Sequence, residues 1–226
     1  MDSSESIEFP VTNDSNSINY EDLINLGTST AENSVDEGYK NAYNSVMIVT
    51  KIAKDNNVKP SFLKYEDSLE AGSSDTDAVV NAASEGLQEY INSARNQINA
   101  LSDELIQQKR TLSSILDNYQ NSIYERADYL IKSNKDNPKE SEIVKARILI
   151  KHINPDYKAS YSNALDALQD GIFKNAGNLV DKAFTTKAAA DIDNAKKAIE
   201  ELKTIPEEFL DSNTINFISS LEAKLN

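Results

Sequence analysis

The stretch that decides the fold is residues 76–133, TDAVVNAASEGLQEYINSARNQINALSDELIQQKRTLSSILDNYQNSIYERADYLIKS. It contains no proline, and its only glycine is Gly86. Apolar residues recur every three or four positions, which is the spacing of one face of a helix. Five of them keep a seven-residue step, as in the seam of a coiled coil, namely Ile91, Ile98, Leu105, Leu112 and Tyr119. The pattern predicts one continuous helix over 76–133.

The length of that helix indicates whether the rest of the chain could cover the seam. At 1.5 Å per residue it would be about 87 Å long, whereas a compact chain of this size is roughly 45 Å across. The helix must therefore project from the body or turn back on itself. The only polar interruption is 107–110 (QQKR), which has no Gly, Pro or Asn to make a turn. We therefore expect a continuous rod whose seam, Ile91 to Tyr119, is covered by other protein subunits.

The segments on either side also read as helices. Ser34 and Glu37 have the spacing of a capping box, which predicts that a helix begins there, and Pro60 favours a second, short helix. The Asn-Pro pairs at 137–138 and 154–155 favour two further helix starts, and a last helix is expected from about Asn213. No strand of useful length alternates apolar and polar residues. The expected organisation is an arm (1–34), two short helices (35–72), a long central helix (76–133) and a C-terminal helical bundle (137–226).

The predicted fold class follows from this organisation. The chain is expected to be all-α and elongated, with one long central helix, a C-terminal group of shorter antiparallel helices and an extended N-terminal arm. The arm is rich in Ser, Asn and acids, a composition that does not fold alone. Ile7, Phe9 and Val11 alternate with other residues, as in an extended peptide lying along a partner. Tyr20 and Leu23 begin a stretch that would make one amphipathic helical turn, and we count all five as interaction residues.

Charge is unevenly distributed along the chain. The net charge is −14, and residues 1–40 carry nine acids against one base. An acidic surface repels phosphate backbones, so direct nucleic-acid binding is disfavoured. Residues 109–151 carry nine bases against six acids. That segment is either a solvated helix face or a docking surface for an acidic partner, including another copy of the chain.

Residues that carry chemistry are scarce. The chain has no cysteine, and its one histidine, His152, stands at an expected helix end, where a capping or surface role is usual. One histidine cannot supply an HExxH zinc site or a di-iron bundle, and no glycine-rich phosphate loop or GxSxG elbow is present. The short acidic pairs at Asp75/Asp77 and Asp191/Asp193 read as helix caps and exposed faces. We therefore expect no catalytic, cofactor or metal site.

The function that these observations favour is non-enzymatic. The first hypothesis is a structural or assembly protein, the helical component of a larger multi-protein complex such as a phage-like virion. Its partners would be other protein subunits, including copies of itself. The second is a surface-exposed bacterial helical-bundle adhesin or ligand-binding protein. No secretory signal is seen, and no apolar run is long enough to span a bilayer, so a membrane partner is not expected and virion or cytoplasm is favoured over secretion.

Overall fold

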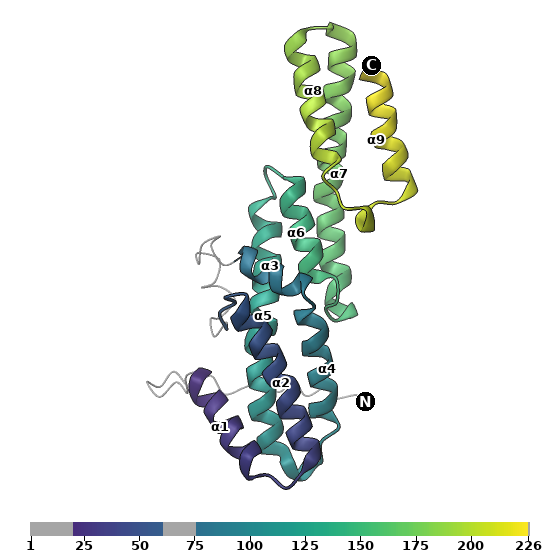
Figure 1. The fold of residues 1–226 in the computed structure, drawn as a ribbon. Coiled ribbons are helices and arrows are strands. Elements are labelled where there is room, and N and C mark those ends of the chain that lie inside the picture. The colour runs from purple at the N-terminus through teal and green to yellow at the C-terminus, as the bar shows by residue number, and fades with distance from the viewer. Residues whose placement is uncertain (1–19, 61–75, 226) are drawn as a thin grey trace.

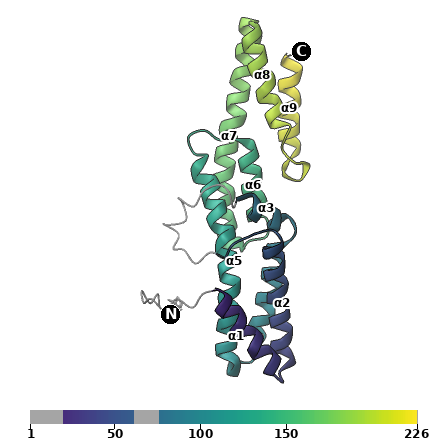
Figure 2. The same cartoon turned by 60° about the vertical axis from the view of Figure 1, so that its left-hand side comes forward.

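The structure is a computed structural model and describes residues 20–60 and 76–225. Over these residues the chain is helical and contains no strand, so the predicted all-α class is confirmed. The molecule is elongated, with one group of helices at each end and a third between them (Figure 1). Figure 2 shows the same order from a second side, with α8 and α9 at the end opposite α1 and α2.

Four helices form the first group, which we call the N-terminal group: α1 (Tyr20–Asn33), α2 (Glu37–Asp55), α4 (Leu87–Asn99) and α5 (Ile106–Ser133). α2 packs against α4, and both α1 and α2 pack against α5. The shared core is made of fully buried apolar side chains from these helices, among them Val46, Val49, Ile91, Ile115 and Leu116.

The continuous helix predicted over 76–133 is wrong, although a long central helix is present as α5. The stretch divides into α3 (Thr76–Ser84), α4, a short 3-10 helix η3 (Asp103–Leu105) and α5. Gly86 separates α3 from α4 with a φ of +91°, a left-handed conformation that glycine adopts without steric cost. Between α4 and η3 the chain reverses, so that α4 and α5 lie side by side and antiparallel (Figure 1).

The reversal occurs before the polar 107–110 stretch. It coincides with a helix start signal at Ser102, across which the seven-residue step continues. Ser102 is extended, with φ −60° and ψ 147°, and its hydroxyl accepts a hydrogen bond from the backbone N–H of Glu104 at 3.3 Å. Ser is a preferred N-cap residue, and the acids that follow it suit the positive end of a helix. Leu101 is buried just before the turn, which anchors the chain where it changes direction.

The N-terminal predictions are corrected in part. Residues 20–33 of the expected arm form α1, a helix rather than extended chain, while residues 1–19 lie outside the described residues. α2 begins at Glu37 and is capped by Asp36, whose carboxylate accepts from the Tyr39 N–H at 2.8 Å. Ser34 therefore does not cap the helix; its hydroxyl accepts from the Asp36 N–H at 3.1 Å. The short helix expected from Pro60 falls at 61–75, outside the described residues.

The C-terminal half consists of α6 (Glu140–Ile150), α7 (Pro155–Thr186), α8 (Ala189–Leu202), a short η4 (Glu207–Phe209) and α9 (Ser212–Leu225). The predicted start at Asn154-Pro155 is confirmed, because the Asn154 side chain accepts from the Asp156 N–H at 3.0 Å. The start expected near Asn213 is also confirmed.

α7 joins the middle of the molecule to its distal end (Figure 1). Its first half packs beside α6 and α5, where Tyr161 stacks on Tyr124 with ring centroids 6.4 Å apart. Its second half packs with α8 and α9 into what we call the distal group, residues 173–225 (Figure 1). Phe173 and Phe217 bring α7 and α9 together with ring centroids at 5.8 Å.

Candidate functional site

The interaction residues predicted along the seam lie inside the protein. Ile91, Leu112 and Tyr119 are fully buried, Ile98 is 2% exposed, and Leu105 is partly buried against the same core. The chain covers its own seam, because α4 and α5 turn their apolar faces toward each other and toward α2. These five residues are therefore core residues of this fold rather than a surface for another subunit, which corrects the prediction.

The other predicted interaction residues belong to the arm. Leu23 is partly buried and packs against the core from α1. Tyr20 begins α1, but its side chain is outside the described part of the chain. Ile7, Phe9 and Val11 also lie outside it, so their predicted role stays a prediction.

The basic segment at 109–151 is largely engaged within the chain. Lys145 contacts Asp77 at 2.9 Å and Glu142 at 3.2 Å, and Arg147 contacts Asp166 at 2.7 Å. Lys109 pairs with Asp103 and Lys151 with Glu208. Cations that already have carboxylate partners add little attraction for an acidic protein, so this segment is a weaker docking surface than its composition indicates.

A buried carboxyl group lies where α6, α7 and α8 meet, and it is the most unusual polar group of the described residues. Glu140, the first residue of α6, is fully buried. Its Oε1 accepts a hydrogen bond from Gln169 Nε2 of α7 at 2.6 Å. Arg147, two turns further along α6, donates to Gln169 Oε1 at 2.6 Å and to Asp166 Oδ1 at 2.7 Å. We call Glu140, Arg147, Asp166, Gln169 and Glu201 the junction cluster.

Glu201 joins the cluster from α8 by capping α6. The residue before α6, Lys139, provides no side-chain cap. Instead, the backbone N–H of Glu140 donates to Glu201 Oε1 at 3.1 Å, so a carboxylate from another helix satisfies one of the free donors at this helix end. The helix start predicted at Asn137-Pro138 is therefore two residues early. In the turn before α6, the side chain of Asn134 accepts a hydrogen bond from the Lys139 N–H at 3.2 Å.

The environment of Glu140 favours its neutral form. Burial raises its pKa to about 7, because an ionised carboxylate loses its hydration inside the protein. The hydrogen bond from Gln169 and the charge of Arg147 act in the opposite direction, and the negative charge of Glu201 raises the pKa further. Two polar atoms of the cluster, Glu140 Oε2 and Arg147 Nε, are buried without a hydrogen-bond partner among the described residues.

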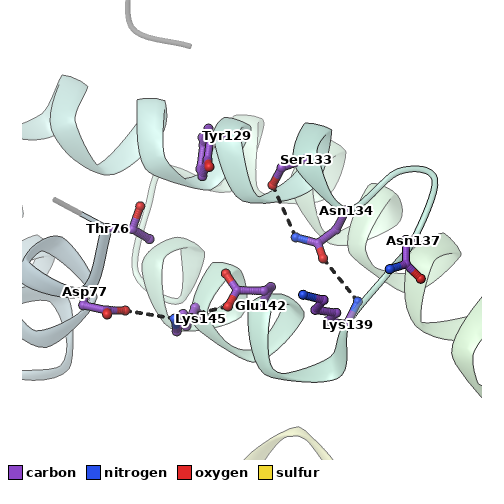
Figure 3. A pocket seen from close by; sticks show the side chains of 9 residues that line it. All are labelled: Thr76, Asp77, Tyr129, Ser133, Asn134, Asn137, Lys139, Glu142 and Lys145. Atoms are coloured by element: carbon purple, nitrogen blue, oxygen red, sulfur yellow. Dashed lines mark hydrogen bonds and ion pairs between the residues drawn. The ribbon is translucent and has the colours of Figure 1, made fainter. Parts of the chain in front are cut away.

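Two open hollows flank the loop that connects α5 to α6. The first, of about 480 Å³, lies among α3, α5 and α6 (Figure 3). The Asp77–Lys145–Glu142 ion pairs line one side of it, and Tyr129 and Asn134 line the other. Its lining is polar and carries both signs of charge, which is suited to small polar molecules rather than to apolar ligands.

The second hollow, of about 590 Å³, lies on the α7 and α8 side of the same loop and reaches the junction cluster. Its lining includes Glu201, Lys135, Lys139, Gly171 and Ile172. A Cβ placed on Gly171 would meet no atom within 4 Å, so the space beside α7 is empty at this point.

Sequence reasoning missed the junction cluster. Glu140 precedes Ile143 by three positions and Ile150 by ten, which places it on the buried face of α6. That register is a signal that the carboxyl group faces the core. Its partners, Gln169 and Glu201, are 29 and 61 residues away, and no local pattern indicates such contacts.

Metal and histidine chemistry find no support in the part of the chain that the structure describes. No three metal-ligating side chains gather there. His152 lies beyond the end of α6, where its Nε2 is 2.9 Å from Glu89 Oε1 and its backbone oxygen accepts from Asn92 at 2.9 Å. It is a partly exposed surface residue, consistent with the expectation.

Comparison of the chain with protein-family models, with curated proteins and with solved structures gives no significant match. Among the described helices, none is both long enough and apolar enough to cross a membrane.

Proposed function

We propose that this protein is a non-enzymatic helical component of a multi-protein assembly, and that it acts as an elongated spacer between two partners. A virion is one setting for such a component. The seam of Ile91 to Tyr119 is internal and does not support the proposal. The observation that supports it is α7, a 32-residue helix that belongs to two packed groups at once.

The shape of the molecule gives the proposal its physical content. At 1.5 Å per residue α7 is about 48 Å long, close to the whole diameter of a compact protein of this size. The N-terminal and distal groups therefore present separate outer surfaces that a single partner of ordinary size does not reach together. Large apolar side chains are exposed on both, such as Leu26 and Ile48 at one end and Phe184 and Ile215 at the other.

The experiment is a mass measurement of the protein in its native source, by gentle lysis, size separation and native mass spectrometry after chemical cross-linking. The proposal predicts a complex with at least two cross-linked neighbours, one joined through the N-terminal group and one through the distal group. Variants with charge at one end, Ile48→Glu or Phe184→Glu, should each remove one neighbour and leave the other. Recovery of the protein only as a free monomer, with no cross-linked neighbour, would reject the proposal.

The second candidate is a ligand-binding or adhesive helical bundle displayed on a bacterial surface. The observation that favours it is the pair of hollows on either side of the α5–α6 loop, because small-molecule sites are concave and polar groups line both. It predicts that the intact protein is detected on unpermeabilised cells and that a small polar ligand raises its melting temperature. A Tyr129→Ala variant should lose that shift while remaining folded. Absence of surface labelling and of any thermal shift would exclude this candidate.

A further inference from the structure

The junction cluster lies where the distal group contacts the rest of the molecule. Glu140 and Arg147 belong to α6, Asp166 and Gln169 to the first half of α7, and Glu201 to α8 of the distal group. α8 packs mainly against α7 and α9, while α6 packs on α5, α7 and α3. The hydrogen bond from the Glu140 N–H to Glu201 is therefore a direct tie between the distal group and the rest of the protein.

We propose that the protonation state of Glu140 controls the contact between the distal group and the rest of the protein. Its neutral form holds α6 against α7 and α8, and its ionisation releases the distal group from the α6 end of the body. This inference goes beyond the proposed function and does not depend on it, since it concerns how two parts of this chain are held together.

Among the described residues, no cation is bonded to Glu140. The positive group nearest to it in the cluster is Arg147, whose Nη2 is already hydrogen-bonded to Asp166 and to Gln169. Gln169 connects the two groups and donates to Glu140 Oε1. An ionised Glu140 would therefore be stabilised by one amide hydrogen bond and a guanidinium that another carboxylate already neutralises. This is poor compensation for a fully buried charge.

The charges around the junction cluster come from several elements. α8 contributes the negative Glu201, α7 contributes the negative Asp166, and α6 contributes the positive Arg147. The α5–α6 loop contributes Lys135 and Lys139, which line the adjoining hollow together with Glu201. On the α3 side of α6 the charges are Asp77, Lys145 and Glu142, and these are paired with one another. Ionisation of Glu140 would thus place a second negative charge beside Glu201, while Arg147 is already paired with Asp166.

The space beside Glu201 allows the repulsion between an ionised Glu140 and Glu201 to be relieved. Glu201 lies on an exposed part of α8 and borders a hollow of about 590 Å³. It can turn away from Glu140 into this space, and Gly171 leaves the α7 side open. The α6 end then loses its cap, and water gains access to the Glu140 carboxylate.

The direction of the pH dependence follows from the raised pKa of Glu140. Because folding favours the protonated form of Glu140, the contact between the distal group and α6 is fully stabilised below about pH 4.5. This stabilisation is lost as the pH rises through about 7. With a pKa near 7, about 3% of the molecules carry an ionised Glu140 at pH 5.5 and about 97% at pH 8.5.

The test uses the full chain, which has no cysteine, so introduced cysteines are labelled selectively. Spin labels at Asp136→Cys and Lys196→Cys report the distance between the α5–α6 loop and α8 by pulsed electron resonance. We expect a narrow distance distribution at pH 5.5 and a broader, longer one at pH 8.5, with a midpoint near 7. A control pair within the N-terminal group, Asn44→Cys and Asn121→Cys, should give the same distribution at both pH values.

Two further variants separate the proton effect from simple destabilisation. Glu140→Gln keeps the acceptor for Gln169 and cannot ionise, so its distribution should stay narrow at both pH values. Glu201→Gln removes the negative charge that raises the pKa of Glu140, so the midpoint should move to lower pH. An unchanged distribution of the parent pair between pH 5.5 and 8.5, or the same broadening in Glu140→Gln, overturns the proposal.

Discussion

The reversal between α4 and α5 predicts an energetic coupling between two buried amides. Gln88 Nε2 donates to Gln120 Oε1 at 2.8 Å, and Gln120 Nε2 donates to Gln88 Oε1 at 2.7 Å. Both side chains are buried. In a continuous helix the two residues would be about 48 Å apart and independent of each other. In the antiparallel pair they satisfy each other, so the coupling between them measures the reversal directly.

The magnitude follows from what each substitution leaves behind. Gln88→Ala removes both hydrogen bonds with Gln120 and the one to Asn92, and it leaves the Gln120 amide buried and unpaired, which costs about 2–3 kcal/mol including the unsatisfied groups. Gln120→Ala has the same effect on Gln88, although Gln88 keeps its hydrogen bond to Asn92 at 2.9 Å. In the double variant neither amide remains. Its destabilisation should therefore be smaller than the sum of the two single effects by about 1–3 kcal/mol.

The assay is urea unfolding of the wild type, both single variants and the double variant, followed by far-ultraviolet circular dichroism. A second cycle on Arg95 and Asp117, which also join α4 to α5 at 2.6 Å but are each about one-third exposed, is the control. Its coupling should be only about 0.2–1 kcal/mol, as for other solvent-screened ion pairs. If the effects at Gln88 and Gln120 add to within about 0.5 kcal/mol, the reasoning about the α4–α5 pair is refuted.

Three further predictions concern single positions, each checked by the free energy of unfolding. Gly86→Ala should destabilise the protein by about 1–2 kcal/mol because of its left-handed φ, whereas Gly171→Ala, in a helix beside open space, should stabilise it by about 0.5–1 kcal/mol; equal effects would contradict this. Asp36→Ala should cost about 1 kcal/mol by removing the cap of α2, and Asp36→Asn should recover most of it. The stability of the wild type relative to Glu140→Gln should fall as the pH rises from about 4.5 through 7, by on the order of 3 kcal/mol; a difference that is independent of pH would rule this out.

The sequence predicted the helical class and several helix ends because these depend on neighbouring residues. Asn154-Pro155 caps and starts α7 through groups two residues apart, and no tertiary contact is needed to make the signal. The all-α assignment followed in the same way from apolar residues repeated at three and four positions. Such local signals survive whatever the helices pack against.

The continuous helix over 76–133 was a wrong prediction because a seven-residue step does not specify which protein covers it. Ile98 and Leu112 both face inward from α4 and α5, so their spacing runs on in register across the turn between them. The weak indications of a break, Gly86 and Ser102, are a single tolerated glycine and a single N-cap residue. Their effect was decided by the burial of both apolar faces within one chain, which is a tertiary property.

The junction cluster is harder to foresee for a related reason. A glutamate near a helix start is ordinarily a solvated residue whose negative charge interacts favourably with the helix dipole. Glu140 differs only because Gln169 and Glu201 arrive from two other helices and exclude water from it. The identity of a buried carboxyl group in this chain therefore depends on contacts between helices rather than on its own neighbours.

The pairing of α1 with α5 has a consequence for how the chain folds as it is synthesised. α6 to α9 pack largely on helices that are adjacent in sequence, so each finds a partner soon after it emerges. α1 ends at Asn33, but α5 begins only at Ile106, and ribosomes add about 5–20 residues per second. The part of α1 that packs on α5 must therefore wait several seconds for its partner, so its apolar side chains stay exposed longer during synthesis than those of α6 to α9.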